Sequence, residues 1–199
     1  MRTVHAIETE SYRILNARAD LSALPPLSRA VVERVVHASA DLGYVEDLRC
    51  DEAALVRGLA ALRAGRPVVA DVEMVAAGIT RRDRLGPLLC RIADPAAAEI
   101  AATTGVTRSA AAARLAFEQA GSDAVWVIGC APTALFELLH LDARPALVIG
   151  LPVGFVGAAE SKDALRRSGL PALTNLSEKG GSAVAAAALN ALLYKEDTP

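Results

Sequence analysis

Five short apolar runs, spaced along the chain, constrain the fold more than any other sequence feature. Each run is bounded by Gly, Pro or Asp and is apolar at consecutive positions, as expected for strands buried on both faces of a sheet. A strand with one exposed face would instead alternate apolar and polar residues. The runs therefore predict a buried, mostly parallel sheet with strands within residues 67–70, 88–93, 124–129, 146–150 and 171–175.

Helical patterns separate most of these runs, because parallel strands need crossover connections. Apolar residues recur at helical spacing in residues 28–42, 107–120, 133–141 and 159–168. Helix ends are expected at Ser28, Thr107, Gly121 and Gly169. We predict a three-layer α/β/α sandwich with an open, mostly parallel five-stranded sheet, preceded by an N-terminal helical arm at about residues 8–40. Since no linker or repeat divides the sequence, residues 1–199 are expected to form a single domain.

Composition excludes several classes of protein. The 199 residues include 21 basic and 23 acidic side chains, and the net charge of -2 gives no general attraction to nucleic acid or anionic membranes. The N-terminus has no signal-peptide pattern, and the Ala-rich run at 183–193 is too short to span a bilayer. Three widely spaced cysteines, Cys50, Cys90 and Cys130, fit a reducing compartment and argue against a zinc site. We expect a cytoplasmic protein that binds no metal.

The loops after the predicted strands carry the chemically informative residues, because ligands of open parallel sheets bind at the carboxyl ends of the strands. Residues 150–162 and 178–182 are rich in glycine, which permits either close approach of a ligand or tight packing turns. A G-x-G-x-x-G motif and a P-loop are both missing, so nucleotide binding lacks its usual geometry. Arg108, Lys162 and Lys179 lie near these loops and suit a ligand with several carboxylates, although each is also typical of a solvated surface.

Arg108 is the most informative of these cations. Thr107 can cap a helix and would place Arg108 in its first turn. The helix dipole disfavours a cation there, so an anionic ligand would offset an unfavourable position.

His37 is the candidate acid or hydrogen-bond donor. Glu33 and Asp41 lie four residues before and after it, on the same side of the predicted helix. Such carboxylates would favour the imidazolium form near neutral pH. The alternative is a surface histidine in a charged stripe. The sequence contains no nucleophile elbow and no H-E-x-x-H motif, so hydrolase and metalloprotease chemistry gain no support.

Six segments together resemble the precorrin-8X methylmutase family of corrinoid biosynthesis. The similarity runs in order from about residue 7 to residue 193, and its 150–165 block is long and specific. The segments are V-V-H-A-S around His37, D-V-E-M-V-A-A-G-I-T-R, T-R-S-A-A-A, A-P-T-A-L-F-E-L, G-L-P-V-G-F-V-G-A-A-E-S-K-D-A-L and K-G-G-S-A-V-A-A-A-A-L-N-A-L.

The resemblance implies an isomerase that moves a methyl group from carbon 11 to carbon 12 of a tetrapyrrole. The product would be hydrogenobyrinate, or cobyrinate when cobalt is already inserted. The family also implies the α/β/α fold, no cofactor, and a homodimer that holds the tetrapyrrole near the subunit boundary.

Site residues follow from the same resemblance. The family's active-site histidine falls on His37, its early serine on Ser11 and its substrate-anchoring arginine on Arg108. Further pocket positions fall on Arg81, Thr133, Lys162 and the amides of Gly154, Gly180 and Gly181. The chemistry is compatible, because an intramolecular methyl shift needs orientation and electrostatic bias rather than a nucleophile.

Two stretches in the predicted pocket loops depart from the family pattern. Cys130 stands where the family usually has Asn, and Leu176 to Glu178 replace an R-G-R segment. Glu178 would repel a substrate carboxylate, and Cys130 removes an amide that both donates and accepts. Two alternatives therefore stay open: a divergent member that binds a corrinoid without turnover, and a nucleotide-binding oxidoreductase.

Overall fold

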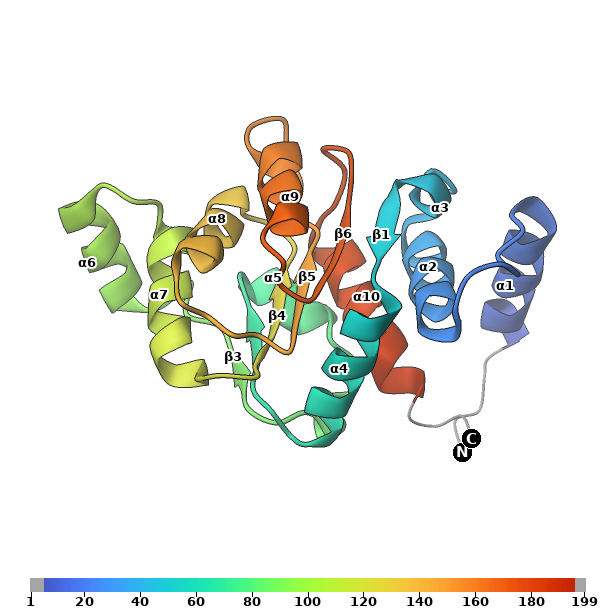
Figure 1. The fold of residues 1–199 in the computed structure, drawn as a ribbon, viewed down its shortest axis with the longest axis horizontal. Helices are drawn as coiled ribbons and strands as arrows, with labels where there is room; N and C mark the ends of the chain where they lie inside the picture. Colours follow the sequence, from blue (N-terminus) through green and yellow to red (C-terminus); the bar gives the residue numbers. More distant parts are fainter. Residues whose placement is uncertain (1–5, 196–199) are drawn as a thin grey trace.

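The computed structural model describes residues 6–195 and contains a six-stranded sheet with helices on both faces (Figure 1). The strands are β1 Leu48–Cys50, β2 Val68–Ala70, β3 Leu88–Leu89, β4 Val125–Ile128, β5 Leu147–Gly150 and β6 Ala172–Asn175. Their spatial order is β1-β6-β5-β4-β2-β3. All neighbours pair in parallel except β1, which is antiparallel to β6.

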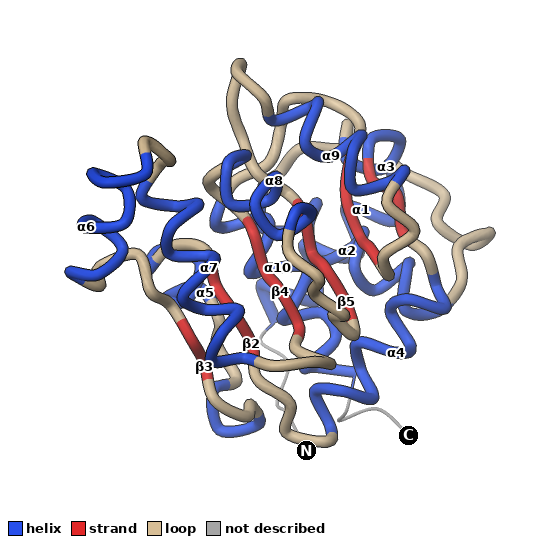
Figure 2. The backbone as a smooth tube through the Cα atoms, turned by 60° about the vertical axis from the view of Figure 1, so that its left-hand side comes forward, coloured by secondary structure: helices blue, strands red, loops and turns tan. Residues whose placement is uncertain are grey.

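All five predicted strands are present, and Figure 2 shows β3, β2, β4 and β5 side by side. Every residue of β4 and β5 is buried, which explains their continuous apolar runs. The predicted count of five strands was wrong, because β1 had no sequence signal. It is a three-residue edge strand in which Leu48 is buried and Arg49 is exposed.

The described residues form ten α-helices and one short 3-10 helix, most of which cover the two faces of the sheet. They are α1 Ala6–Arg18, α2 Pro26–Ser39, α3 Tyr44–Asp47, α4 Glu52–Arg63, α5 Glu73–Gly78, η1 Arg82–Arg84, α6 Pro95–Thr104, α7 Arg108–Ala120, α8 Pro132–His140, α9 Ala158–Arg167 and α10 Ser182–Lys195. Within residues 6–195, none of them combines the length and apolar character needed to cross a membrane.

Two hydrophobic cores lie on opposite faces of the sheet and confirm the predicted three-layer fold. Buried residues of α2, α4, α5 and α10 pack on one face, and those of α7, α8 and α9 pack on the other. Successive strand residues serve different cores: Val127 faces the α10 side, whereas Trp126 and Ile128 face the α7 side. A smaller cluster joins α6 to α7.

The predicted N-terminal arm, residues 8–40, divides into two helices with different roles. α2 is a core helix, because Val31, Val32, Val35 and Val36 are buried in the same cluster as α10. Of these two helices, α1 lies outside the layers, against α2 at one end of the molecule (Figure 1).

Three of the four predicted helix ends are confirmed. The Thr107 side chain caps α7 by accepting from the Ala110 amide, and positive-φ glycines follow α7 and α9. The prediction at Ser28 was wrong, because α2 begins at Pro26. The Glu52 carboxylate caps this end instead: it accepts from the Leu27 amide at 2.9 Å and from the Ser28 amide at 2.8 Å.

We predict that Glu52→Ala lowers the free energy of unfolding by about 1–2 kcal/mol at neutral pH, as expected for loss of a helix cap. Burial opposes ionisation of Glu52, but the hydrogen bonds from Ser28 and Leu27 lower the pKa of its carboxyl. The contribution is therefore complete at neutral pH and is lost as the pH falls through this lowered pKa. Urea unfolding at pH 7 and pH 3 measures both effects. Glu118→Ala, on the exposed side of α7, is the control, and an equal change in both variants would contradict the assignment.

Candidate functional site

The carboxyl ends of β2 and β4 form the topological switch point, because the chain leaves them toward opposite faces of the sheet. Asp71 follows β2 here and its carboxylate accepts three backbone hydrogen bonds, from the amides of Gly129 at 3.1 Å, Cys130 at 2.8 Å and Ala131 at 2.9 Å. Burial raises the pKa of this carboxyl against the opposing effect of the three amides. Asp71 thus satisfies the loop amides that a ligand would otherwise meet.

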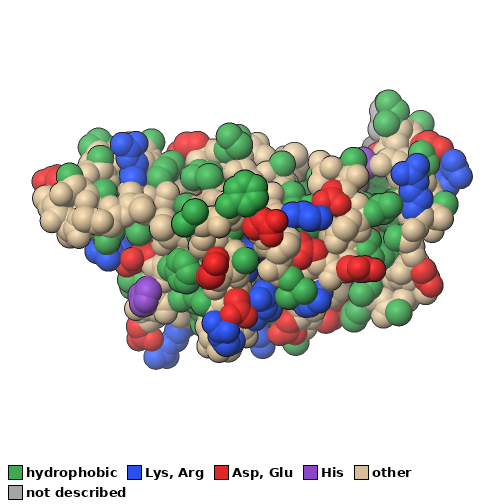
Figure 3. Space-filling model, turned by 90° about the horizontal axis from the view of Figure 1, so that it is seen from above, with side chains coloured by type: hydrophobic (Ala, Val, Ile, Leu, Met, Phe, Trp, Pro, Cys, Tyr) green, Lys and Arg blue, Asp and Glu red, His purple; other side chains and the backbone are tan. Residues whose placement is uncertain are grey.

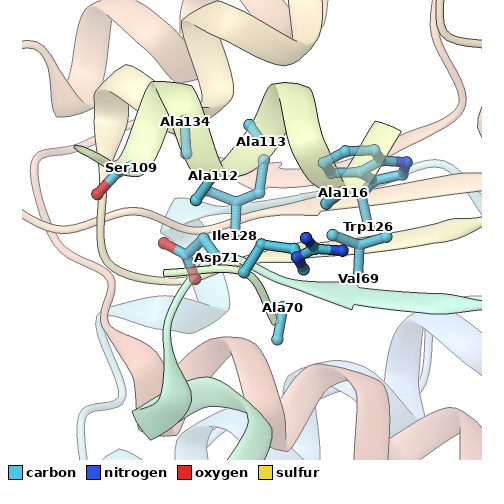
Figure 4. Close-up of a pocket in the computed structure, with 11 residues that line it drawn as sticks. Val69, Ala70, Asp71, Ser109, Ala112, Ala113, Ala116, Trp126, Ile128 and Ala134 are labelled. Atoms are coloured by element: carbon cyan, nitrogen blue, oxygen red, sulfur yellow. The ribbon is translucent and has the colours of Figure 1, made fainter. Parts of the chain in front are cut away.

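The space between α7 and the strands at this point is small. Figure 4 shows Asp71 and Ser109 at one end of it, with the α7 alanines and Trp126 along its length. Its volume is about 10 Å³, which is close to the minimum for one water molecule. A macrocycle cannot bind in this cavity, so the substrate needs a different surface.

The glycine loops at residues 151–157 and 176–181 pack against one another. The Gly154 amide donates to the Glu178 carbonyl at 3.1 Å, and the Gly181 amide donates to the Leu151 carbonyl at 2.9 Å. At Gly180 a Cβ atom would lie 2.3 Å from the Leu151 carbonyl oxygen, so only glycine allows this contact. Two of the three predicted substrate amides are therefore engaged within the protein.

The tip of the first loop carries exposed apolar side chains. Phe155 is 95% exposed, and Val153, Val156 and the neighbouring Leu176 are also exposed. Figure 3 views this edge of the molecule and shows hydrophobic side chains gathered near its middle, between scattered charges. Exposed apolar groups of this kind mark a contact surface for a ligand or a protein.

Lys162 lies on α9 but does not reach this surface, because its side chain is 0% exposed. Its ammonium donates to Asn175 Oδ1 at 2.9 Å and to the carbonyls of Ser177 and Lys179. All three of its protons thus have acceptors within the protein. Burial lowers the pKa of Lys162 to about 8, with Asp47 opposing the shift.

Lys179 connects the second glycine loop to the end of α2. Its ammonium donates to Asp41 Oδ2 at 2.8 Å and lies 5.2 Å from the centre of the Tyr44 ring. The hydrogen bond to Asp41 raises the pKa of Lys179. This cation therefore lies at the carboxyl edge, partly exposed and close to the turn that follows His37.

His37 lies in the last turn of α2 and faces α1. Its Nδ1 is hydrogen-bonded to Ser11 Oγ at 2.7 Å, and the Tyr12 ring stacks on the imidazole with centres 5.2 Å apart. The expected carboxylate environment was wrong: Glu33 pairs with Arg29, and Asp41 pairs with Lys179. Ser11 orients the ring instead, which leaves Nε2 as the atom that can meet a ligand.

A groove beside His37 has room for part of a large ligand. A cavity of about 140 Å³ is lined by residues of α1, α2 and the turn after α2, including Ser11, Arg18 and His37. It shares Ser11 and Ile14 with an adjoining, more open depression of about 500 Å³ along α1. We call this surface the α1–α2 groove, and its walls are mainly apolar.

Arg108, Thr133 and Arg81 lie elsewhere. Arg108 is exposed in the first turn of α7, next to Thr107, whose hydroxyl donates to Thr133 at 2.7 Å. Arg81 pairs with Asp83 at 3.3 Å. Thr80, the residue before Arg81, is hydrogen-bonded to the C-terminal half of α10. The 176–181 glycine loop leads into the opposite, N-terminal end of that helix.

The predicted site residues thus form two main groups on one chain. Ser11, His37 and Lys179 gather around the end of α2, which packs with α10 on one face of the sheet. Arg108 and Thr133 lie at the starts of α7 and α8, which cover the opposite face.

Comparisons with known proteins identify the family of this chain. The sequence model of the precorrin-8X methylmutase family matches residues 6–195. The chain is 41% identical over 196 residues to a cobalt-precorrin-8 methylmutase of Salmonella typhimurium, covering 94% of this chain and 93% of that protein. It is 42% identical over 206 residues to a precorrin-8X methylmutase of Pseudomonas aeruginosa, covering 99% and 98%.

A solved structure of a precorrin-8X methylmutase from Thermus thermophilus superimposes with a TM-score of 0.86 and 36% identity, covering 96% of this chain and 95% of that one. This chain belongs to the precorrin-8X methylmutase family. In this member, the two stretches expected to depart from the family pattern lie at the carboxyl edge. Cys130 is an exposed residue, but partial desolvation of its thiol and the nearby Asp71 carboxylate raise the pKa of that thiol. Glu178 is exposed, and its main-chain carbonyl still joins the glycine loops.

Sequence reasoning missed several residues that shape this methylmutase-family site. Asp71 and Tyr12 had weak signals, since one directly follows a strand and the other adjoins Ser11. Asp47 and Asn175 had none, because their importance depends on contacts across 128 positions of sequence. Within residues 6–195, no group of three or more His, Cys, Asp or Glu side chains is arranged to hold a metal ion.

Proposed function

We propose that this protein is the isomerase that moves a methyl group from carbon 11 to carbon 12 of precorrin-8X, giving hydrogenobyrinate. Family membership over nearly the whole chain supports this function. The observation that carries the proposal is the hydrogen-bonded pair of Ser11 and His37 beside the apolar α1–α2 groove. The cobalt-containing substrate, cobalt-precorrin-8, would give cobyrinate by the same step.

The reaction needs little covalent chemistry from the protein. The bond from the methyl group to carbon 11 breaks as its bond to carbon 12 forms, so nothing leaves the substrate. The protein must hold the macrocycle in the reactive shape and favour one electronic state of its conjugated system. With Nδ1 held by Ser11 and the ring stacked on Tyr12, His37 directs Nε2 into the groove as an acid or hydrogen-bond donor.

Cationic side chains around the edge would bind the acidic groups of the tetrapyrrole. Lys179 is connected to the end of the helix that carries His37, because its ammonium donates to Asp41 in the turn after α2. Arg108, Thr133 and Arg81 would bind further carboxylates, together with the Gly180 amide. The buried Lys162 and the engaged amides of Gly154 and Gly181 do not meet the substrate in this conformation.

A homodimer would bring the two groups of site residues together. His37 and Arg108 belong to helices that cover opposite faces of one sheet. In a symmetric dimer, a second copy can present Arg108 and Thr133 to the α1–α2 groove of the first, with the tetrapyrrole at the boundary. The exposed Phe155 and Val156 supply apolar area for such a contact.

The cobalt content of the substrate and the location of the protein in the cell are both predictions. The chain is about equally similar to relatives named for the cobalt substrate and for the cobalt-free one, at 41% and 42% identity, so similarity does not choose between them. A cytoplasmic location is proposed from the biosynthetic family. The intact Ser11–His37 pair favours turnover over a carrier that only binds a corrinoid.

We predict that His37→Ala lowers the rate of the methyl shift at least about 100-fold, as expected for loss of an acid–base group, and that Ser11→Ala lowers it about 10-fold. Both variants should bind hydrogenobyrinate within a few-fold of the natural protein, measured from the visible spectrum. His140→Ala, at the exposed end of α8, is the matched control. Unchanged turnover in His37→Ala would remove this residue from catalysis, and calorimetric preference for NADP over hydrogenobyrinate would indicate an oxidoreductase.

The shared site is tested by mixing two inactive variants. If each site uses His37 of one copy and Arg108 of another, co-refolded His37→Ala and Arg108→Ala chains recover up to about a quarter of the natural activity, because half of the dimers contain one intact site. A mixture as inactive as its components, although subunit exchange is shown by two affinity tags, would contradict a shared site.

A further inference from the structure

Lys162 combines complete burial with complete hydrogen bonding. Its side chain is 0% exposed, and its ammonium meets Asn175 Oδ1 at 2.9 Å, the Lys179 carbonyl at 2.6 Å and the Ser177 carbonyl. Burying an ammonium is unfavourable unless its protons are all satisfied. An apolar side chain would fill the same volume at lower cost, so packing alone does not explain a lysine at this position.

Asn175 extends this contact to a half-buried carboxylate, that of Asp47. Its amide donates to Asp47 Oδ2 at 2.7 Å and to the Lys179 carbonyl at 3.0 Å. Asp47 in turn accepts from the amides of Leu176 at 3.0 Å and Ser177 at 2.9 Å, and from the Ser177 hydroxyl at 2.7 Å. The Lys162 ammonium therefore binds carbonyls of this segment, and the Asp47 carboxylate binds two of its amides.

The segment held in this way is the loop between β6 and α10, residues 176–181, which has no regular secondary structure. Its remaining contacts reach the other parts of the site. The Lys179 ammonium donates to Asp41, in the turn that follows α2, and the Glu178 carbonyl accepts from Gly154. The loop thus links the 151–157 loop to the helix that carries His37.

We propose that Lys162 is a positioning residue, which acts through Asn175 and Asp47 to hold the 176–181 loop in the shape that places Lys179 and Gly180 against the acidic groups of the substrate. The inference rests on the proposed function, since it assigns these two loop residues to corrinoid binding. Lys162 itself does not touch the substrate, and its charge is used inside the protein.

The proposal gives a pH dependence that a purely space-filling lysine would not show. Burial lowers the pKa of Lys162 to about 8; Asp47 and Glu178 oppose the shift, and Arg166 adds to it. Above that pH the amine keeps two protons for three acceptors, and the loop loosens. Lys179 keeps its charge in this range, because its hydrogen bond to Asp41 raises its pKa.

The test compares Lys162→Met with Arg167→Met, a control on the same helix whose side chain is 72% exposed. Three quantities are measured on each full-length variant: hydrogen exchange of the 176–181 amides, affinity for hydrogenobyrinate, and KM and kcat for the methyl shift. In Lys162→Met we expect the 176–181 amide hydrogens to exchange at least about tenfold faster, because the loop opens locally more often. We also expect KM and the product dissociation constant to rise about tenfold while kcat changes only a few-fold, because the Ser11–His37 pair is intact.

A second set of measurements keeps the proposal falsifiable if Lys162→Met does not fold. In the natural protein, affinity for hydrogenobyrinate should fall above about pH 8, and loop exchange, corrected for its intrinsic pH dependence, should rise over the same range. Asp47→Asn, which removes the carboxylate but keeps the shape, should weaken binding in the same direction.

The outcomes separate this inference from the proposed function. The positioning role would be overturned if folded Lys162→Met exchanged its 176–181 amide hydrogens and bound hydrogenobyrinate as the natural protein does. It would also be overturned if hydrogen exchange of this loop in the natural protein, corrected for its intrinsic pH dependence, did not change up to pH 9.5. Both conclusions hold even if turnover is normal. Faster loop exchange in Lys162→Met, with no methyl shift by the natural protein, would overturn the proposed function and leave the structural role of Lys162 supported.

Discussion

The backbone groups at the carboxyl edge of the sheet need hydrogen-bond partners, and two buried charged side chains supply them. Asp71 accepts three amides of the loop after β4, while Lys162 donates to two carbonyls of the loop after β6. The Asp71 carboxylate thus satisfies backbone N–H donors, and the Lys162 ammonium satisfies backbone carbonyl acceptors. Unpaired polar groups at these buried positions would each be costly, so the two loops adopt shapes that depend on these charges.

This arrangement determines where a ligand can bind. In many open parallel sheets, the free amides at the switch point receive the ligand. Here Asp71 engages them and leaves a cavity of only about 10 Å³. We therefore propose that recognition falls to side chains around the edge and to the α1–α2 groove, where the Ser11–His37 pair lies beside apolar walls.

How much the sequence predicts depends on how far apart in the chain the interacting residues lie. The buried strands and the Thr107 cap were predictable, because a continuous apolar run and a capping side chain act locally. The expected carboxylates beside His37 were at helical spacing, but Arg29 and Lys179 bind them, and the Lys179 contact spans 138 positions. Lys162 was expected at the substrate for its charge and from the family resemblance, and only the packing of α9 against β6 shows that it is buried.

The central claim is that the imidazole of His37, oriented by Ser11, meets the bound corrinoid through Nε2. Nitrogen NMR of protein labelled in histidine, with resonances assigned by comparison with His37→Gln, tests this contact directly. The account predicts that saturating hydrogenobyrinate moves the Nε2 resonance of His37 and leaves that of His140 in place. Unchanged His37 resonances in the fully bound protein would contradict it.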